Sequence, residues 1–296
     1  HTGEDVQVTL VPAAVNTGIV FVRTDADSTE IPALAKHINR TNRQTILQKG
    51  EISVGTVEHL MASLYALGID NLRIELDGSE VPILDGSAAP IVDLINGAGI
   101  EEQSEEKNYY TLEEPFIFKD EDGSEIMALP SEDFEVSPLI DYGSSVLGPQ
   151  HAQLNKMTDF REEIASARTF SFLRELVPLL DQGLIKGGGL NNEIVYVDQE
   201  IAPETLEKLK KAFDRDDVDV TSFGTLNNIE LRFSNEAARH KLLDVVGDIA
   251  LLGRPLKARI IATKPGHGVN AEFTKALAAK IKKQESRPQA PKYDPN

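Results

Sequence analysis

Hydrophobic and polar positions alternate near the start of the chain in a pattern that predicts β-strands. Residues 6–11 alternate between apolar and polar side chains, and residues 19–22 form a short apolar run. Both patterns are typical of strands. A third strand is predicted at residues 71–76, where the turn pair Asp77 and Gly78 follows.

Two helices are predicted among these strands. Residues 57–67 lie between Thr56, whose side chain can cap a helix, and Gly68, which can end one. Residues 87–95 carry Pro90 near their start and are followed closely by glycine. The order after the first strands is therefore helix, strand, helix.

The rest of the chain mixes the two kinds of element. The segment from Asp120 to Gly123 lies between strand-like stretches and predicts a hairpin turn. Strands are predicted at residues 134–140, 194–197, 228–233 and 257–262. Helices are predicted at residues 159–167, 172–180, 203–213, 236–252 and 270–281. Pro178 should strain or kink the second of these, and Asn270 can cap the last.

The order helix, strand, helix at residues 57–95 returns at residues 236–281, and each first helix has a histidine near its start. This recurrence predicts an α+β fold of two related domains, each a mainly antiparallel sheet with a helix pair. The acidic stretch at 101–106 is the best boundary, which gives domains at 1–106 and 107–283. Residues 284–296 are polar and contain proline, as a linker or disordered tail would.

Composition and charge argue against several classes of protein. The 296 residues are 41% hydrophobic and 26% charged, which is ordinary for a soluble globular protein. The net charge of −18 argues against nucleic-acid binding, which needs clustered Lys and Arg. No apolar run approaches the roughly 18 residues of a membrane span, and no signal-peptide pattern opens the chain. We therefore expect a cytoplasmic protein without a membrane span.

The chain has no cysteine, so any metal must be bound by His, Asp or Glu. The absence of cysteine also fits a reducing cytoplasm. The first residue is His1 rather than Met, which is typical of a processed product, an engineered chain or a fragment.

The longest predicted helix carries a polar stripe with the spacing of metal ligands. His240 and Asp244 are spaced i, i+4, so both side chains project from one face. Asp248 continues the stripe one turn later, and Lys241 lies beside it. Such a pair is a common way for a helix to supply a metal site. The competing interpretation is a solvated stripe on an amphipathic helix.

Two further histidines have suggestive neighbours. Glu58 and His59 fall in a first helical turn, where the macrodipole disfavours imidazolium and so favours the neutral form that binds metals. His267 is flanked by Gly266 and Gly268, which let a loop approach a site closely. Each feature also has a non-functional interpretation. Glu58 and His59 could lie on an exposed helix surface, and His267 could be a solvent-facing loop histidine.

Taken together, these residues predict a zinc-dependent amidase. Two histidines and an aspartate give a three-ligand site with one position open, as in catalytic zinc sites. The expected ligands are His59, His240 and Asp244. Glu58 could take a proton from water at the metal. A protonated His267, steadied by Asp248, could stabilise an oxyanion or protonate a leaving nitrogen.

At these residues the sequence resembles the UDP-3-O-acyl-N-acetylglucosamine deacetylases of lipid A synthesis. The resemblance spans nearly the whole chain, from His1 to about residue 283. It rests on blocks at residues 56–61 (TVEHLM), 68–71 (GIDN), 81–88 (VPILDGSA), 167–170 (ARTF), 239–244 (RHKLLD), 247–248 (GD) and 266–267 (GH). These blocks together are highly specific to that family.

The resemblance implies zinc-dependent hydrolysis of the N-acetyl group of UDP-3-O-acyl-N-acetylglucosamine, the committed step of lipid A synthesis. It implies Zn²⁺ at the three ligands above, with Glu58 as general base and His267, steadied by Asp248, as the cationic acid. Thr169 would contact the carbonyl oxygen or the intermediate, and Lys241 the phosphate side of the substrate. The family's fold has two α+β domains, whose helices pack against each other between the sheets.

The resemblance also implies which residues bind the rest of the UDP-linked acylated amino sugar. Phe170 would pack on the sugar, and Asp141 and Tyr142 would hold uridine. An insertion at residues 170–197 would line an apolar passage for the acyl chain, through Phe172, Leu176, Ile185 and Val195.

Two departures from the family's pattern keep other functions open. Residues 143–145 (GSS) follow Tyr142 where the family often has a His-Pro pair. The glycine run at residues 186–192 reads KGGGLNN where many members carry Ser and Asp. A zinc amidase acting on another acylated sugar and a non-catalytic UDP-sugar binding module are the alternatives.

The proline-bearing tail is similar to the linker of a subgroup in which the deacetylase is fused to a 3-hydroxyacyl carrier-protein dehydratase. If the chain belongs to that subgroup, it is one half of a bifunctional protein, with the dehydratase after the C-terminal tail.

Overall fold

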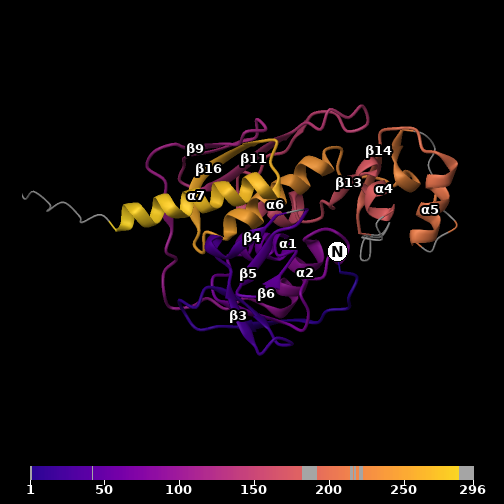
Figure 1. Ribbon diagram of the computed structural model, residues 1–296. Helices are drawn as coiled ribbons and strands as arrows, with labels where there is room; N and C mark the ends of the chain where they lie inside the picture. Colours follow the sequence, from indigo (N-terminus) through magenta and orange to yellow (C-terminus); the bar gives the residue numbers. More distant parts are fainter. Residues whose placement is uncertain are drawn as a thin grey trace, which may run out of the picture.

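Two β-sheets lie on either side of a layer of helices (Figure 1). The computed structural model describes residues 2–41, 43–181, 192–213, 216, 218–219 and 223–286. Helices and strands alternate irregularly along these ranges, and both kinds of element contribute to one main core. The α+β class predicted from the sequence is therefore confirmed.

The N-terminal sheet has a mostly antiparallel arrangement. Its strand order is β1 (Val8–Pro12), β7 (Leu72–Leu76), β2 (Ile19–Arg23) and β3 (Thr29–Pro32). β7 pairs antiparallel with β1 and parallel with β2, while β2 pairs antiparallel with β3. After β3 come the short helix η1 (Ala35–His37) and a small antiparallel sheet of β4 (Ile38–Arg40), β5 (Ile46–Lys49) and β6 (Ile52–Val54).

Two helices, α1 (Glu58–Ala66) and α2 (Ala89–Ala98), share a core with the N-terminal sheet. α2 has Pro90 in its first turn, as predicted. α1 begins differently from the prediction, because Thr56 does not cap it. Thr56 has a φ of 55°, and its hydroxyl donates a hydrogen bond to Glu80 instead.

The second sheet is larger and has its latest strand in the middle. Its order is β12 (Gln150–His151), β11 (Phe134–Ile140), β16 (Leu256–Thr263), β10 (Glu125–Pro130) and β9 (Phe116–Lys119), and β8 (Tyr110–Thr111) also pairs with β16. β16 is antiparallel to β10 and parallel to β11. The antiparallel pair of β9 and β10 confirms the predicted hairpin turn, where Gly123 has a φ of 87°.

The two sheets repeat one topology. The orders β1-β7-β2-β3 and β10-β16-β11-β12 both place a later strand, β7 or β16, between two strands that are consecutive in the chain. The parallel and antiparallel neighbours are also the same. In the second half, α6 (Glu236–Ala250) precedes β16 and α7 (His267–Glu285) follows it. The predicted pair of related halves is therefore present in the fold. The boundary near residue 106 stays a prediction.

Helices α1, α6 and α7 pack against one another between the sheets (Figure 1). α6 and α1 approach closely at Gly247, where an added Cβ would lie 2.1 Å from the carbonyl oxygen of Glu58. Only glycine permits this distance between the two backbones. The contact sets the first turn of α1 beside the middle of α6.

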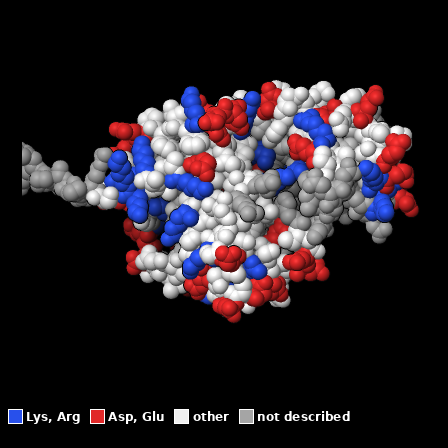
Figure 2. Space-filling model, in the orientation of Figure 1, with Lys and Arg blue, Asp and Glu red and all other residues white. Residues whose placement is uncertain are grey.

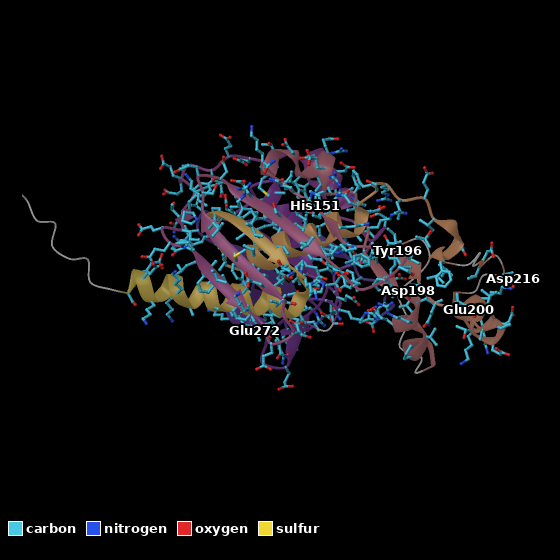
Figure 3. All side chains as sticks on the ribbon, turned by 90° about the horizontal axis from the view of Figure 1, so that it is seen from above. His151, Tyr196, Asp198, Glu200, Asp216 and Glu272 are labelled. Atoms are coloured by element: carbon cyan, nitrogen blue, oxygen red, sulfur yellow. The ribbon has the colours of Figure 1, made fainter. Side chains whose placement is uncertain are left out.

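A smaller unit projects from one end of the molecule (Figure 1). It contains β13 (Phe170–Phe172), β14 (Ile194–Val197), β15 (Gly224–Thr225), α4 (Leu173–Asp181) and α5 (Pro203–Phe213). Because side chains alternate along a strand, β14 contributes Ile194 and Tyr196 to the main core and Val195 and Val197 to a separate small core. Figure 3 shows Tyr196 where this unit joins the rest of the molecule and Asp216 towards its far end.

Two predicted elements are wrong because their backbone groups bind elsewhere. The helix predicted at 159–167 is only η2 (Met157–Asp159) and α3 (Phe160–Glu163), since the carbonyl of Ala165 accepts from the amide of Ala88. The strand predicted at 228–233 is replaced by η3 (Leu226–Asn228) and irregular chain. There the carbonyl of Ile229 accepts from a threonine and that of Glu230 from an arginine, instead of from a neighbouring strand.

The last helix is longer than predicted. α7 begins at His267 rather than at Asn270 and ends at Glu285, so His267 starts a helix instead of lying in a loop. Asn270 does not cap this helix, because its side-chain amide donates to Asp248. Of the predicted tail, residues 284 and 285 are helical, and residues 287–296 lie outside the described residues.

Charged side chains of both signs cover the face of the molecule in Figure 2. Lys and Arg side chains gather over the C-terminal part of α7, whose last turn carries Lys282 and Lys283. Cations at this end of a helix complement its dipole. Among the helices that the structure describes, none has both the length and the apolar character that crossing a membrane requires.

Candidate metal centre

The three predicted ligands lie side by side in the layer of helices. His59 is in the first turn of α1, and His240 and Asp244 are one turn apart on α6. One ligand atom from each residue lies within 4.8 Å of the other two. Asp244 Oδ1 is 3.4 Å from His240 Nε2 and 3.9 Å from His59 Nε2.

The polar stripe on α6 is buried rather than solvated. His240 and Asp244 are each 1% exposed, and Asp248 is 0% exposed. The interpretation of this stripe as a solvated helix face is therefore wrong. The first turns of α1 and α7 cover it, because His59 and His267 both contact Asp244.

These donors fit a divalent metal ion. Asp244 Oδ1, the carboxylate oxygen nearest both imidazoles, is buried without a hydrogen-bond partner. Such an atom is unfavourable unless a cation or donor faces it. Imidazole nitrogen and carboxylate oxygen are both ligands that zinc accepts, and three of them leave a position open.

Both histidines of the triad are in the form that binds metals. His240 Nδ1 lies 3.0 Å from the carbonyl oxygen of Ala167 and donates its proton there, which leaves the lone pair on Nε2. Burial lowers the pKa of His240. Burial and the neighbouring His240 together lower the pKa of His59 to about 3. Metal ligation requires neutral imidazole, so neither residue must lose a proton first.

Glu58 and His267 face the triad from two helix starts. His267 Nε2 is 3.8 Å from Glu58 Oε1 and 3.8 Å from Asp244 Oδ2. Burial raises the pKa of Glu58 to about 7, although the charge of His267 opposes this. Burial alone would lower the pKa of His267, but the carboxylates of Asp244, Glu58 and Asp248 raise it to about 9. Near neutral pH, Glu58 can therefore exchange a proton readily, and His267 is cationic.

Asp248 contacts the Nδ1 side of the His267 ring, and both of its carboxylate oxygens have hydrogen-bond partners. Its Oδ2 is 3.2 Å from His267 Nδ1 and 2.9 Å from the side-chain nitrogen of Asn270. Its Oδ1 accepts a 2.6 Å hydrogen bond from the hydroxyl of Thr45. The backbone amide of Thr45 also donates to Glu58 Oε2 at 3.0 Å. Thr45 therefore links the partner of His267 to Glu58.

Sequence reasoning missed Thr45 and misassigned Asn270. Thr45 lies in a stretch without a motif, and no pattern distinguishes its hydroxyl from those of other threonines. Asn270 is three residues after His267, in the first turn of α7. Residues at this spacing lie on the same face of a helix, so both side chains reach Asp248. That spacing was the one available signal.

Several predicted substrate residues lie next to His240. Lys241 donates to Asp244 Oδ2 at 2.7 Å and lies 5.5 Å from the ring centre of Phe170. Burial alone would lower the pKa of Lys241, but Asp244 raises it, so this side chain is cationic. The ring centre of Phe170 is 6.4 Å from that of His240 and 5.6 Å from that of Tyr142.

The other predicted substrate residues lie around this cluster or apart from it. Thr169 precedes Phe170 in the chain and donates its backbone amide to the carbonyl of Gly86 at 2.8 Å. Asp141 is exposed and accepts from the amide of Gly143. Phe172 belongs to the main core, whereas Leu176 and Val195 belong to the small core. Ile185 lies outside the described residues, and the acyl passage stays a prediction.

The arrangement as a whole suits metal-assisted hydrolysis. Two neutral imidazoles and a carboxylate can hold a metal, a second carboxylate can accept a proton, and an imidazolium can donate one. Glu58 and the three proposed ligands are buried and the side chain of His267 is only 10% exposed, which strengthens their mutual electrostatic interactions.

Comparison with known families gives a match over most of the chain. The profile of the LpxC family, described as UDP-3-O-acyl N-acetylglycosamine deacetylase, matches residues 1–215 and 209–279. The matched ranges contain every residue of the candidate metal centre described above.

Curated relatives are of two kinds. Proteins from Bacteroides thetaiotaomicron and Chlorobaculum tepidum, both named bifunctional enzyme LpxC/FabZ, are 45% and 46% identical over 100% and 94% of this chain. The chain spans only 64% and 60% of their lengths. A protein from Myxococcus xanthus, named UDP-3-O-acyl-N-acetylglucosamine deacetylase, is 42% identical over 94% of this chain and 81% of its own length. By its sequence this chain belongs to the LpxC family of UDP-3-O-acyl N-acetylglycosamine deacetylases.

Proposed function

We propose that this chain is a zinc-dependent deacetylase that removes the N-acetyl group from a UDP-linked, 3-O-acylated glucosamine. One observation carries the proposal: Glu58 and His267, from two different helix starts, face the buried group of His59, His240 and Asp244. The pKa of one is near 7 and that of the other near 9. An amide hydrolase needs such an acid and base at one centre.

His59, His240 and Asp244 would hold the zinc ion. When bound, zinc lowers the pKa of water towards about 7 and polarises a carbonyl oxygen. Glu58 takes the proton from the attacking water as its oxygen bonds to the acetyl carbon. His267 then gives a proton to the amide nitrogen as the C–N bond breaks. The products are acetate and the protonated amine, which together carry all the protons of the amide and the water, and the proton taken by Glu58 balances the one given by His267.

The surrounding residues would bind the remainder of the substrate. Lys241 is cationic and next to the ligands, so it can contact the phosphate side of the substrate. Phe170 and Tyr142 offer aromatic faces for the sugar and for uridine. Thr169 would contact the carbonyl oxygen or the intermediate, and Asp141 would bind uridine with Tyr142. The acyl chain would pass the unit that contains α4.

Metal content and turnover of variants test the proposal. We expect about one zinc ion in each purified chain and deacetylation of UDP-3-O-acyl-N-acetylglucosamine that chelators abolish. Glu58→Gln should keep the zinc and lose about 10²–10⁴-fold in kcat, because the base is gone but the ligands remain. His59→Ala should lose zinc and activity together.

The matched control is His151→Ala, which removes an exposed histidine side chain on β12 (Figure 3) and leaves every proposed ligand in place. It should keep both zinc and turnover. A wild-type chain without zinc whose deacetylase activity ignores chelators would contradict the proposal. Equal ligand binding without turnover in wild type and Glu58→Gln would favour a binding module instead, and preferential turnover of nucleotide-free sugars would point to another amide substrate.

We also propose that the chain is the deacetylase part of a longer, bifunctional protein. Its high identity to two LpxC/FabZ enzymes, of which it spans 64% and 60%, supports this. A 3-hydroxyacyl carrier-protein dehydratase would then follow the C-terminal tail. The cytoplasmic location stays a prediction from the sequence.

A further inference from the structure

Glu236, the first residue of α6, has a carboxylate that is completely buried. Its Oε1 accepts from the backbone amide of Arg168 at 3.0 Å and from Arg168 Nε at 2.9 Å. Its Oε2 accepts from Arg168 Nη2 at 3.2 Å and from the backbone amide of Arg232 at 2.6 Å. Both oxygens of this carboxylate are therefore saturated with donors.

The amide that Glu236 binds belongs to the same peptide group as a carbonyl at the metal centre. The peptide unit between Ala167 and Arg168 has its N–H on Glu236 Oε1 and its C=O against His240 Nδ1, at 3.0 Å. A trans peptide is planar, and its N–H and C=O point in opposite directions. Fixing the direction of one of these groups therefore fixes the direction of the other.

This peptide unit has no strand neighbour to orient it. Residues 167–169 are irregular and lie just before β13. Glu236 and His240 are spaced i, i+4 on α6, so both lie on the face that meets this segment. The two side chains thus hold one peptide plane between them, in the position that a neighbouring strand would otherwise occupy.

A carboxylate at a helix start is more often a simple stabilising group, because it complements the helix dipole. Glu236 differs in two respects. It is fully buried, and its bonds go to the backbone amide of Arg168, 68 residues away in the chain, and to that of Arg232 just before the helix, rather than to its own first turn. A role in stability alone would not require the link through the peptide plane to His240.

We propose that Glu236 is a positioning residue for the metal centre, which acts through the Ala167–Arg168 peptide plane to set the tautomer and orientation of the ligand His240. With the plane fixed, the carbonyl of Ala167 holds the proton on Nδ1 and leaves Nε2 free for the metal. Thr169 and Phe170, the proposed substrate residues, follow directly in the same segment. The orientation of this peptide plane therefore affects both the metal centre and the residues that would contact the substrate.

Glu236→Gln tests this with little change in shape. The amide nitrogen of glutamine cannot accept a hydrogen bond, so one pair of donors must lose its partner whichever way the side chain turns. We expect the dissociation constant for zinc, measured by competition with a chromophoric chelator, to rise about 10–100-fold. We also expect kcat to fall by a similar factor, with KM changing by less than about threefold.

Two further variants separate positioning from stability. Arg168→Lys removes the guanidinium bonds but keeps the backbone amide on Glu236, so it should lower the melting temperature and leave zinc affinity near that of wild type. Ile74→Val lowers the stability of the core of the N-terminal sheet without changing a residue of the site, and it controls for the effect of a lower melting temperature. The ¹⁵N shifts of His240 in the zinc-free protein provide a direct readout. They should show protonated Nδ1 in wild type and mixed tautomers in Glu236→Gln.

The proposal is overturned if Glu236→Gln binds zinc as tightly as Ile74→Val at matched stability, or if Arg168→Lys weakens zinc binding as much as Glu236→Gln does. It rests on the proposed zinc site, but the two can fail separately. Wild-type protein that binds zinc without deacetylating the sugar contradicts the proposed function and leaves this inference intact. Wild-type protein without affinity for zinc contradicts both.

Discussion

Thr45 contacts both proposed catalytic residues. Its backbone amide donates to Glu58, and its hydroxyl donates to Asp248 and lies 3.3 Å from His267 Nδ1. Asp248 can therefore keep its charge directed at His267 only while Thr45 and Asn270 satisfy its other lone pairs. Thr45 is 0% exposed, so water cannot replace the hydroxyl without rearrangement.

We predict that Thr45→Val lowers kcat about 10–100-fold, because one bond to Asp248 is lost and the orientation of His267 becomes less defined. The amide bond to Glu58 remains in this variant, so zinc content should not change. Stability should fall by about 1 kcal/mol, the usual contribution of one hydrogen bond. Steady-state kinetics and thermal unfolding measure the two effects.

Thr24→Val is the matched control for this substitution. The hydroxyl of Thr24 donates to the carbonyl of Leu76 at 3.1 Å, beside the N-terminal sheet and away from the site. Because Thr24 is exposed, this variant should lose less stability than Thr45→Val, and it should keep its kcat. Equal kcat values for the two variants would show that Thr45 has only a structural role.

At the residue scale, the kinds of residue that form the site could be predicted, but their burial could not. His240 and Asp244 could be predicted from their i, i+4 spacing, and His59 from its place beside Glu58 in a first helical turn. A polar stripe on a helix has the same pattern whether solvent or another helix covers it, so the solvated interpretation of Asp248 could be rejected only from the packing. Thr45 was missed because its role comes from two partners far away in the chain.

At the scale of elements, the contact between α1 and α6 determines how close the ligands lie. Gly247 lets the two backbones meet, and the carbonyl that it faces belongs to Glu58 itself. Any side chain at this position must push α1 away from α6, which would separate His59 from His240 and Asp244.

We predict that Gly247→Ala destabilises the fold by about 1–3 kcal/mol and weakens zinc binding, because the added Cβ cannot fit 2.1 Å from a carbonyl oxygen. Chemical denaturation measures the first effect and chelator competition the second. The control is Gly97→Ala in α2, where an added Cβ meets nothing within 4 Å. It should stabilise the protein by about 0.5–1 kcal/mol. A Gly247→Ala variant as stable as Gly97→Ala would contradict the close contact.

Several regular elements could be predicted from their own hydrophobic pattern, although the strands β3 to β6 were missed. The strand at 134–140, the strand at 194–197 and the helix at 203–213 have the predicted bounds. The wrong predictions fall where backbone groups bind side chains or distant segments, as at Ala165 and Glu230. These bonds leave no periodic pattern in the sequence, because each depends on a partner from another part of the fold.

At the scale of the whole molecule, the buried carboxylate of Glu236 and the partly exposed one of Asp85 join segments from both halves. Glu236 binds Arg168 and the backbone of Arg232, and Arg232 in turn binds Asp85. Burial alone would raise the pKa of Glu236, but hydrogen bonds from Arg168 and from backbone amides lower it below its usual 4.5. Burial alone would also raise the pKa of Asp85, but hydrogen bonds from Ser87 and Arg232 lower it below 3.8.

We predict that the free energy of unfolding falls steeply below about pH 4.5. A carboxyl group whose pKa is lower in the folded state contributes stability above its unfolded pKa and loses it as the pH falls through the folded value. Urea unfolding between pH 3 and 7 measures this. Glu236→Gln should be less stable at pH 7, by about 1.5–3 kcal/mol for hydrogen bonds to a charged group, and should lose less on acidification. Parallel curves for the two proteins would contradict the assignment.

The order of the strands within the sheets could not be predicted from the sequence. The recurrence of helix, strand and helix correctly indicated two related halves. Nothing local indicates that β16 enters between β10 and β11, because those strands are far from it in the chain and separated from it by the unit with α4 and α5.

The central position of β16 also has a consequence for the order of events on the ribosome. Every strand of the N-terminal sheet emerges before α2, so that half can fold early. The hairpin of β9 and β10 and the pair of β11 and β12 must instead wait, unjoined, until the strand between them has been made. His267 emerges just after that strand. All three proposed metal ligands are therefore translated before His267, and the proposed acid is the last of these groups to join the site.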